Sequence, residues 1–248
     1  KLGTGRAKVS RPLQGRFISV TVSLDAAGRY FATFLCTDMP SKDTTATDRE
    51  VGIDLGVETL ATLSDGRKIG NPRHLKKYER KLAREQRRLS RRKGARRGEK
   101  PSGRYLKQRK RVARIHAKIA DARTDTLHKV TTMLADENQV LCMEDLNAKG
   151  MMRNCHLAKA VSDASFGEFA RLLEYKCAER GRTLVRVGRF YPSSKTCSGC
   201  GHRLDALPLS VRSWDCPACG AHHDRDVNAA RNILAEGKRI LSNTEGTA

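Results

Sequence analysis

Hydrophobic residues first gather in two short segments that are rich in β-branched and aromatic side chains. These segments, 17–24 and 30–36, are joined by the sequence Asp-Ala-Ala-Gly at 25–28, which is typical of a hairpin connection. A polar, threonine-rich stretch without periodicity follows at 41–49 and predicts a linker. We therefore expect a small β element with its linker over about 1–45.

Three further apolar segments predict a meander of antiparallel strands. They cover 51–56, 59–64 and 67–70 and are separated by turns that contain glycine. The first of them holds one carboxylate, Asp54, within an otherwise apolar run. Alternation along a strand would point Asp54 to one face of the sheet, where the neighbouring glycines leave room around it.

About sixty residues with helical periodicity come next. Apolar side chains recur at steps of three, four and seven, which predicts two long helices that pack along their apolar stripes. The stripes consist of Leu75, Tyr78, Leu82 and Leu89, and of Val112, Ile115, Ile119, Ala122, Thr126, Val130 and Leu134. Segment 91–103 breaks the pattern with three glycines and a proline, as expected of the tip of a helical hairpin. The sequence thus predicts a helical hairpin over about 71–135.

The remainder of the chain alternates between strands and helices. A short buried strand is predicted at 139–143, followed by a polar loop, an amphipathic helix at 166–180 and another strand at 183–190. Gly181 suits the position just after the end of the helix. A cysteine-rich segment and a final helix complete the order. This mixture predicts an α/β sheet domain.

The charge of the chain predicts a polyanionic partner. Its 248 residues carry 49 Lys and Arg against 27 Asp and Glu, a formal net charge of +22. Such an excess is typical of proteins that bind nucleic acid. A basic membrane-surface protein would need aromatic anchors, and only 5% of the residues are aromatic. No apolar run is long enough for a membrane span or a secretory signal, so we expect a soluble protein of the cytoplasm, associated with the nucleoid.

The positive charge is densest in the predicted helical hairpin. Roughly twenty Lys and Arg lie between Arg73 and Lys118, with three acids among them. They occupy the helix faces that the apolar stripes leave free, and phosphates would relieve their mutual repulsion. No repeated aromatic pattern accompanies them. The hairpin is therefore expected to contact the nucleic-acid backbone rather than to read bases.

The eight cysteines divide into two groups. Four are scattered and indicate a reducing compartment: Cys36, Cys142, Cys155 and Cys177. The other four form two Cys-x-x-Cys pairs that predict one structural zinc ion held by four thiolates: Cys197, Cys200, Cys216 and Cys219. Four protein ligands leave no open position for catalysis. His202, His222 and His223 could substitute as ligands, but solvated loop histidines are the commoner outcome.

Three carboxylates stand at the ends of predicted strands and helices. Asp54 lies in the first strand of the meander, Glu144 ends the strand at 139–143, and Asp226 begins the final helix. Each has a structural explanation of its own, as a hydrogen-bonded buried acid, a strand-end charge or a helix cap. Together they are the set that phosphodiester hydrolysis needs, since carboxylates from separate elements can hold two Mg²⁺ or Mn²⁺ ions. We therefore predict that Asp54, Glu144 and Asp226 are catalytic metal ligands.

Four motifs along the chain resemble those of the TnpB (OrfB) family of transposon-encoded, RNA-guided DNA nucleases. They are GIDLGVETLATLSDG, VLCMEDLNAKGM, RFYPSSKTCSGCG and CPACGAHHDRDVNAARNIL. The resemblance also extends to the compact type V CRISPR effectors. It implies a RuvC-like, ribonuclease H-like nuclease core whose catalytic acids fall on Asp54, Glu144 and Asp226, with Asp224 as a helix cap. It further implies a zinc module at the four paired cysteines, a partial N-terminal β wedge segment and an inserted basic hairpin along the guide–target duplex.

The resemblance sets an expected domain order and partners. The wedge segment would cover 1–45, the first part of the RuvC-like core 46–193, the zinc-binding module 194–222, and the last helix and tail 223–248. Family members carry a further N-terminal stretch, so this chain is expected to be a truncated member. The expected activity is RNA-guided endonucleolytic cleavage of DNA for an insertion-sequence element, with guide RNA and target DNA as partners.

Two other function classes share features of this sequence. The sequence Ile-Asp-Leu-Gly also opens the nucleotide-binding core of actin-like ATPases and sugar kinases, but those need a second glycine-rich phosphate loop, for which no candidate is present. The second alternative is a protein that binds nucleic acid without cutting it, either as a regulator or as an inactive truncated derivative. A pure binder would gain nothing from three carboxylates beside phosphates, because like charges repel.

Overall fold

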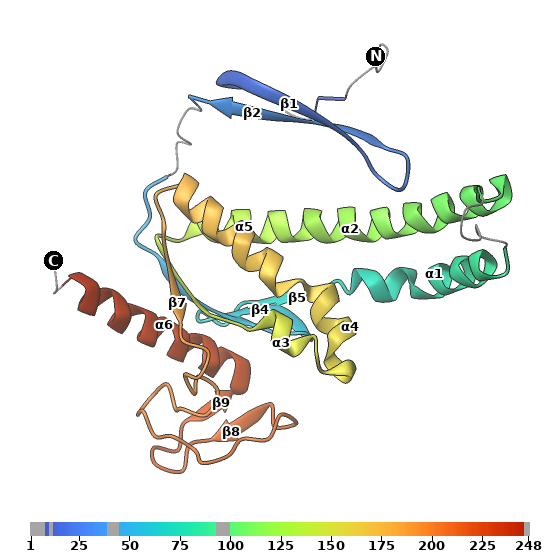
Figure 1. Cartoon of the computed structure of the whole chain (residues 1–248). Helices are drawn as coiled ribbons and strands as arrows, with labels where there is room; N and C mark the ends of the chain where they lie inside the picture. Colours follow the sequence, from blue (N-terminus) through green and yellow to red (C-terminus); the bar gives the residue numbers. More distant parts are fainter. Residues whose placement is uncertain (1–7, 10–11, 39–44, 93–99, 246–248) are drawn as a thin grey trace. The chain divides into compact units, whose positions relative to one another are not determined.

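The computed structural model describes residues 8–9, 12–38, 45–92 and 100–245. The chain divides into two compact units (Figure 1). We call Lys1–Lys42 with Glu85–Arg114 the hairpin unit, and Asp43–Arg84 with Ile115–Ala248 the sheet unit. Two long helices, α1 (His74–Ser90) and α2 (Gly103–Glu137), run from one unit into the other. They confirm the predicted helical hairpin, while most of its tip and part of the predicted linker lie outside the described residues.

The hairpin unit contains the predicted β-hairpin. Strands β1 (Arg16–Leu24) and β2 (Tyr30–Thr37) pair antiparallel, with a register shift between Phe17 and Ser19. The carboxylate of Asp25 fixes the turn by accepting hydrogen bonds from the backbone N–H and the Nε of Arg29, at 2.8 and 2.7 Å. Every residue of β1 is exposed.

The sheet unit is built on a mixed five-stranded sheet with the order β5-β4-β3-β6-β7. Its strands are β3 (Glu50–Leu55), β4 (Thr59–Leu63), β5 (Lys68–Gly70), β6 (Val140–Glu144) and β7 (Thr183–Val187). Neighbours pair antiparallel from β5 to β3 and parallel from β3 to β7. The predicted meander and both later strands are confirmed, although β7 ends three residues earlier than expected.

Helices cover both faces of this sheet (Figure 1). On one face α2 and α5 (Phe166–Glu179) bury apolar side chains against the odd-numbered residues of β3 and β6, such as Ile53 and Met143. On the other face α6 (Arg225–Glu245) packs with Cys142 and Val185. The helix predicted at 166–180 is confirmed, and Gly181 follows its end with a φ of 62°. None of the helices in the described residues is both long and apolar enough to span a membrane.

Helix α6 approaches the sheet most closely at Gly52 of β3. A Cβ atom at this position would lie 2.0 Å from the carbonyl oxygen of Ala230 and 2.8 Å from the backbone nitrogen of Leu234. Only a residue without a side chain allows the helix backbone to lie this near to the strand. This contact sets how closely the second and third turns of α6 approach the sheet.

The prediction of a polar loop after β6 is wrong. Two helices form there instead, α3 (Ala148–Met151) and α4 (Cys155–Ala164). Each begins at an asparagine whose side chain accepts a backbone hydrogen bond, Asn147 from Gly150 and Asn154 from His156. Short helices depend on tertiary packing for stability, which periodicity alone does not reveal.

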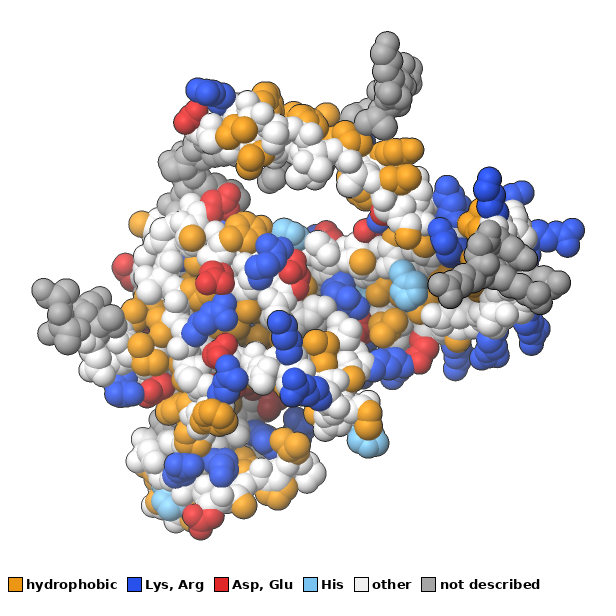
Figure 2. All heavy atoms as spheres, viewed as in Figure 1, with side chains coloured by type: hydrophobic (Ala, Val, Ile, Leu, Met, Phe, Trp, Pro, Cys, Tyr) orange, Lys and Arg blue, Asp and Glu red, His pale blue; other side chains and the backbone are white. Residues whose placement is uncertain are grey.

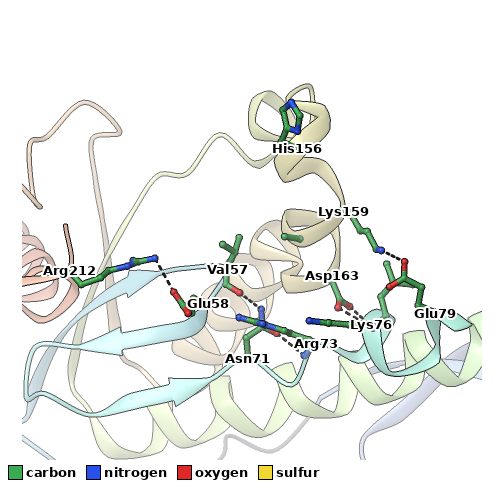
Figure 3. A pocket seen from close by; sticks show the side chains of 12 residues that line it. Val57, Glu58, Asn71, Arg73, Lys76, Glu79, His156, Lys159, Asp163 and Arg212 are labelled. Atoms are coloured by element: carbon green, nitrogen blue, oxygen red, sulfur yellow. Dashed lines mark hydrogen bonds and ion pairs between the residues drawn. The ribbon is translucent and has the colours of Figure 1, made fainter. Parts of the chain in front are cut away.

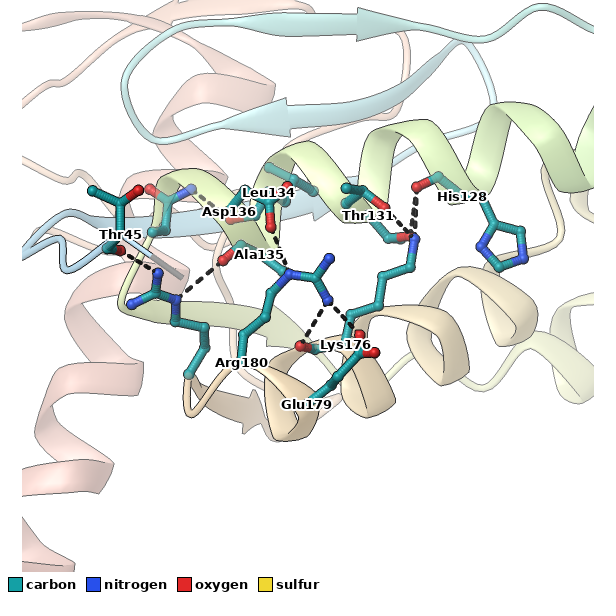
Figure 4. Close-up of polar contacts among 12 residues, drawn as sticks. Thr45, His128, Thr131, Leu134, Ala135, Asp136, Lys176, Glu179 and Arg180 are labelled. Carbon is teal, nitrogen blue, oxygen red and sulfur yellow. Dashed lines mark hydrogen bonds and ion pairs between the residues drawn. The ribbon is translucent and has the colours of Figure 1, made fainter. Parts of the chain in front are cut away.

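Two buried cations, Lys176 and Arg180, form hydrogen bonds that link α5 to α2 (Figure 4). The ammonium of Lys176 donates to the carbonyl oxygen of His128 and to the hydroxyls of Thr131 and Thr132, at 2.6–2.8 Å. One turn later the guanidinium of Arg180 donates to Asp136 at 2.5 Å. Buried charges are tolerated when hydrogen bonds replace their hydration, so these contacts fix the packing of the two helices.

Candidate active site and metal centre

The sheet brings the three predicted catalytic carboxylates to one edge. Asp54 and Glu144 lie near the carboxyl ends of the parallel neighbours β3 and β6, where Ile53 pairs with Met143. Both point to the face that α6 covers, since alternate residues of the two strands face α2 and α5. Asp226 lies in the first turn of α6. All three line one cavity of about 480 Å³.

Glu144 and Asp226 influence Asp54 electrostatically. Burial raises the pKa of Asp54, and the negative charges of Glu144 and Asp226 raise it further, to about 8 against an ordinary value of 3.8. Arg225 opposes this effect in part. Burial also raises the pKa of Glu144, and a hydrogen bond from Ser193 partly offsets that increase. A site that disfavours its own negative charges in this way is prepared for a positively charged ligand.

The oxygen atoms of Asp54, Glu144 and Asp226 lie too far apart for all three to bind one ion. In the described part of the chain, only the four paired cysteines form a group of three or more candidate ligands whose atoms all lie within 4.8 Å of one another. Asp54, Glu144 and Asp226 do not form such a group. Two ions about 3.5–4 Å apart can be held by carboxylates that are too widely spaced to share one ion.

Other side chains fix the start of α6. The carboxylate of Asp224 accepts hydrogen bonds from the backbone N–H groups of Asp226 and Val227, at 3.2 and 3.0 Å, which confirms its predicted role as a helix cap. It also pairs with Lys68 of β5 at 2.7 Å. The guanidinium of Arg212 lies 4.0 Å from a carboxylate oxygen of Asp226. The helix cap by Asp224 and the ion pair between Asp224 and Lys68 hold the first turn of α6, and with it Asp226, at the edge of the sheet.

Sequence reasoning missed a serine and two asparagines that support Glu144. The hydroxyl of Ser193 donates to Glu144, and Asn232 donates to the carbonyl oxygens of Ser193 and Thr196 at 2.7 and 2.6 Å. Asn228 donates to the same Thr196 carbonyl oxygen at 2.7 Å. The two asparagines are four residues apart and therefore share one face of α6, a spacing that could have indicated their common role. Through these contacts α6 positions the loop that holds Glu144.

The paired cysteines form a second candidate centre. The sulfur atoms of Cys197 and Cys219 are 3.7 Å apart, and those of Cys200 and Cys216 are 3.6 Å apart. A tetrahedral zinc ion with Zn–S bonds of about 2.3 Å separates its sulfurs by about 3.8 Å. The four thiols therefore fit zinc. They lie beside two short strands, β8 (Ser213–Asp215) and β9 (His222–Asp224).

The expectation of solvated histidines is wrong for His223. This residue is buried, its ring lies against Trp214 at a centroid distance of 4.7 Å, and its Nε2 is 3.0 Å from the sulfur of Cys197. His223 therefore lies in the immediate surroundings of the cysteine cluster, where it can hydrogen-bond one of the four sulfur atoms. His222 is exposed and contacts Asp215 at 2.7 Å, and His202 is exposed.

The basic residues of α1 and α2 project from the helices as predicted. Figure 2 shows Lys and Arg side chains gathered around the far end of the two helices. Buried positions on the helices include Leu82, Val112, Ile115 and Ile119 from the predicted apolar stripes. A polar pair is buried with them, because Gln108 donates to the carboxylate and to the carbonyl oxygen of Glu85, at 2.8 and 3.0 Å.

Two protein families match the sequence. Residues 33–155 match the family OrfB_IS605, described as a probable transposase. Residues 166–233 match the family of the Cas12f1-like TNB domain. The first match includes Asp54 and Glu144, and the second includes Asp226 and the four paired cysteines.

Curated relatives match over most of the chain. A protein of Streptomyces pristinaespiralis named "Putative RNA-guided DNA endonuclease" is 48% identical over 93% of this chain and 58% of its own length. A protein of Escherichia coli K12 that bears the same name with the addition InsQ is 34% identical over 98% of this chain and 62% of its own length. The chain thus spans about three-fifths of the length of these relatives.

Solved structures share the fold. A Cas12f1 chain from a complex with sgRNA and target DNA aligns with a TM-score of 0.52 at 18% identity, over 87% of this chain and 55% of that chain. A second CRISPR–Cas12f ternary complex aligns with a TM-score of 0.53 at 21% identity. At these identities the likeness concerns the arrangement of helices and strands.

Proposed function

The chain belongs to the TnpB (OrfB) family, and on that premise we propose that it is the nuclease part of an RNA-guided DNA endonuclease of an insertion-sequence element. The observation that carries the proposal is the convergence of Asp54, Glu144 and Asp226 on one cavity from two strands and a distant helix. The names of the curated relatives support the same activity.

The sheet supports a RuvC-like core of the ribonuclease H type. Three antiparallel strands are followed by two parallel ones, in the order β5-β4-β3-β6-β7, with helices on both faces. In this proposal the α1–α2 hairpin is an insertion between β5 and β6. The cysteine module is a zinc ribbon inserted between β7 and α6.

We assign the three carboxylates as ligands of two Mg²⁺ or Mn²⁺ ions. The donor set fits such hard cations, and the raised pKa of Asp54 indicates a site that lacks positive charge. Bound there, the ions would activate a water molecule and stabilise the leaving oxygen. The negative charges of Glu144 and Asp226 both act on Asp54. Ser193 holds Glu144 by a hydrogen bond, and Asp224 holds Asp226 through the helix cap.

In this proposal the basic helices bind nucleic acid, and the cysteine module is stabilised by zinc. The basic surface of α1 and α2 would contact the phosphates of a guide RNA–target DNA duplex, whose base pairing selects the sequence. The zinc ion would stabilise a small module that has few apolar residues of its own. Neither a membrane nor a small-molecule substrate is part of this proposal.

Substitution of Asp54 tests the proposal. In a full-length protein with its copurified guide RNA, Asp54→Asn should abolish Mg²⁺-dependent cleavage of target DNA and leave DNA binding unchanged. Asp65→Asn, which changes an exposed aspartate of the same unit, is the matched control and should cut normally. Cleavage by the Asp54 variant would remove the assignment. Binding without cleavage by the unaltered protein would favour the non-cutting regulator.

A further inference from the structure

A second cavity of about 520 Å³ adjoins the acid-lined one. The two share Val57, Glu58 and Arg212 in their linings. Residues from the segment before α1, from the start of α1 and from α4 form its other walls (Figure 3). Arg212 connects the two spaces, because its guanidinium contacts Glu58 at 2.9 Å and lies 4.0 Å from Asp226.

The acids in this second cavity are already paired. Glu58 pairs with Arg212, and Glu79 pairs with Lys159 of α4. Asp163 is buried, accepts hydrogen bonds from the backbone N–H of Leu75 at 3.0 and 3.1 Å, and contacts Arg123 at 3.2 Å. The negative charges of the lining are therefore neutralised by protein groups.

Two cations of the lining remain available. The side chains of Arg73 and Lys76 make no hydrogen bond or ion pair with the described residues. Both lie at the start of α1, where the helix dipole disfavours positive charge, and the first turn of α1 contains no acid. A bound anion would stabilise both side chains at this place.

The backbone holds Arg73 in an uncommon conformation. Its φ is 49°, in the left-handed region that side chains other than glycine rarely adopt. Asn71 fixes this geometry, because its side chain accepts from the N–H of Arg73 at 3.0 Å and donates to the carbonyl oxygen of Val57 at 2.8 Å. Figure 3 shows Arg73 between the β3–β4 turn and α1. Strain of this kind is frequently retained at binding sites.

We propose that this cavity binds the sugar–phosphate backbone of the single strand whose scissile phosphate lies among the three carboxylates. The inference rests on the proposed nuclease function and extends it to a specific substrate subsite. Arg73 and Lys76 would neutralise phosphates, and Arg212 would lie beside the strand where it passes from one cavity to the other. The volume suits a ligand of nucleotide size.

The walls favour an unpaired strand over a duplex. Val57, Leu75 and Ala160 give the cavity apolar surface, and His156 contributes a ring. A base can reach such surfaces only when it is not paired, since a duplex presents phosphates on its outside. A single-stranded substrate therefore uses both the cations and the apolar walls.

The salt dependence of binding tests the subsite. Arg73→Gln combined with Lys76→Gln removes two charges from the lining, while Lys238→Gln combined with Arg239→Gln removes the same number of charges from exposed positions of α6 outside both cavities. The affinity of the chain for a short oligodeoxythymidine would be measured without divalent cations at several salt concentrations. Each lost phosphate contact reduces the slope of log K against log salt by about 0.7, so the lining variant should lose about 1.4.

A crosslinking experiment locates the strand. The same oligonucleotide, carrying a photoreactive thiothymidine, should attach to the α4 peptide that contains His156 and Lys159. This attachment should disappear in the lining variant, persist in the α6 control, and return when Arg73→Lys and Lys76→Arg restore the charges. An unchanged slope in the lining variant, an equal loss in the control, or attachment elsewhere would overturn the subsite. Because no step requires cleavage, a failure of the nuclease assignment would be seen separately, in the Asp54→Asn cleavage experiment.

Discussion

The pKa of Asp54 leads to a stability prediction that does not depend on activity. Between pH 4 and about 8 the unfolded chain has lost the Asp54 proton, while the folded, metal-free chain keeps it. The folded state therefore binds the extra proton, and its stability falls as the pH rises through this range. Asp54→Asn removes the titrating group, so the variant should become progressively more stable than the unaltered chain as the pH increases.

The size of the effect follows from the same values. Each pH unit over which only the unfolded chain is ionised corresponds to about 1.4 kcal/mol. About three such units separate the ordinary pKa of 3.8 from pH 7, so the free energy of unfolding of the variant should increase by up to about 4 kcal/mol at pH 7. For a unit of this length the melting temperature should rise by roughly 8–16 °C.

The assay compares thermal unfolding of the two chains from pH 4.5 to 8, with zinc present and no added magnesium. Asp65→Asn is the control, because hydrogen bonds from Arg67 outweigh burial and lower the pKa of Asp65. Its loss should leave stability unchanged or reduce it at high pH. Saturating Mg²⁺ should stabilise the unaltered chain and not the Asp54 variant. A stability difference that stays constant with pH, or that shrinks as the pH rises, would refute the reasoning.

Three further predictions concern zinc, packing and charge. Cys197→Ser should lose one equivalent of zinc in elemental analysis, whereas Cys155→Ser, outside the cluster, should retain it; equal zinc contents would contradict the assignment of the ligands. Gly52→Ala should lower the free energy of unfolding by about 3 kcal/mol or more because its Cβ meets backbone atoms, whereas Gly70→Ala, which meets nothing within 4 Å, should have little effect in the same denaturation experiment. Duplex binding should weaken about thousand-fold between 50 and 200 mM salt if at least six phosphates are contacted, and a flat titration would exclude the backbone-binding role of α1 and α2.

Features with a local cause could be predicted from the sequence. The strands around Asp54, the stripes of α1 and α2, and the paired cysteines each depend on spacing within a short segment. The helix cap by Asp224 is likewise local, because its partners are two and three residues away. In each case the residues that interact are close together in the sequence, so their spacing alone predicts the structure.

Features that arise from tertiary contacts could not be predicted in this way. Ser193 contacts Glu144 across 49 residues, and His223 contacts Cys197 across 26. The helix α4 is stabilised by burying Val161 and Ala164 in the core of the sheet unit. The positions of the three carboxylates at strand and helix ends could be predicted from the sequence, but only the folded chain shows that they line one cavity.

The contact between Gly52 and α6 has a consequence for the order in which the protein is synthesised. A ribosome that has reached residue 224 has already made Asp54, Glu144 and the basic helices, but α6 has not yet emerged. If the basic helices bind nucleic acid as proposed, the nascent chain would do so before it possesses the third carboxylate or the helix that packs on β3. Synthesis of α6, Arg225–Glu245, completes the proposed cutting centre, so chains that stop before this helix would, in the proposed function, be binders without the means to cut.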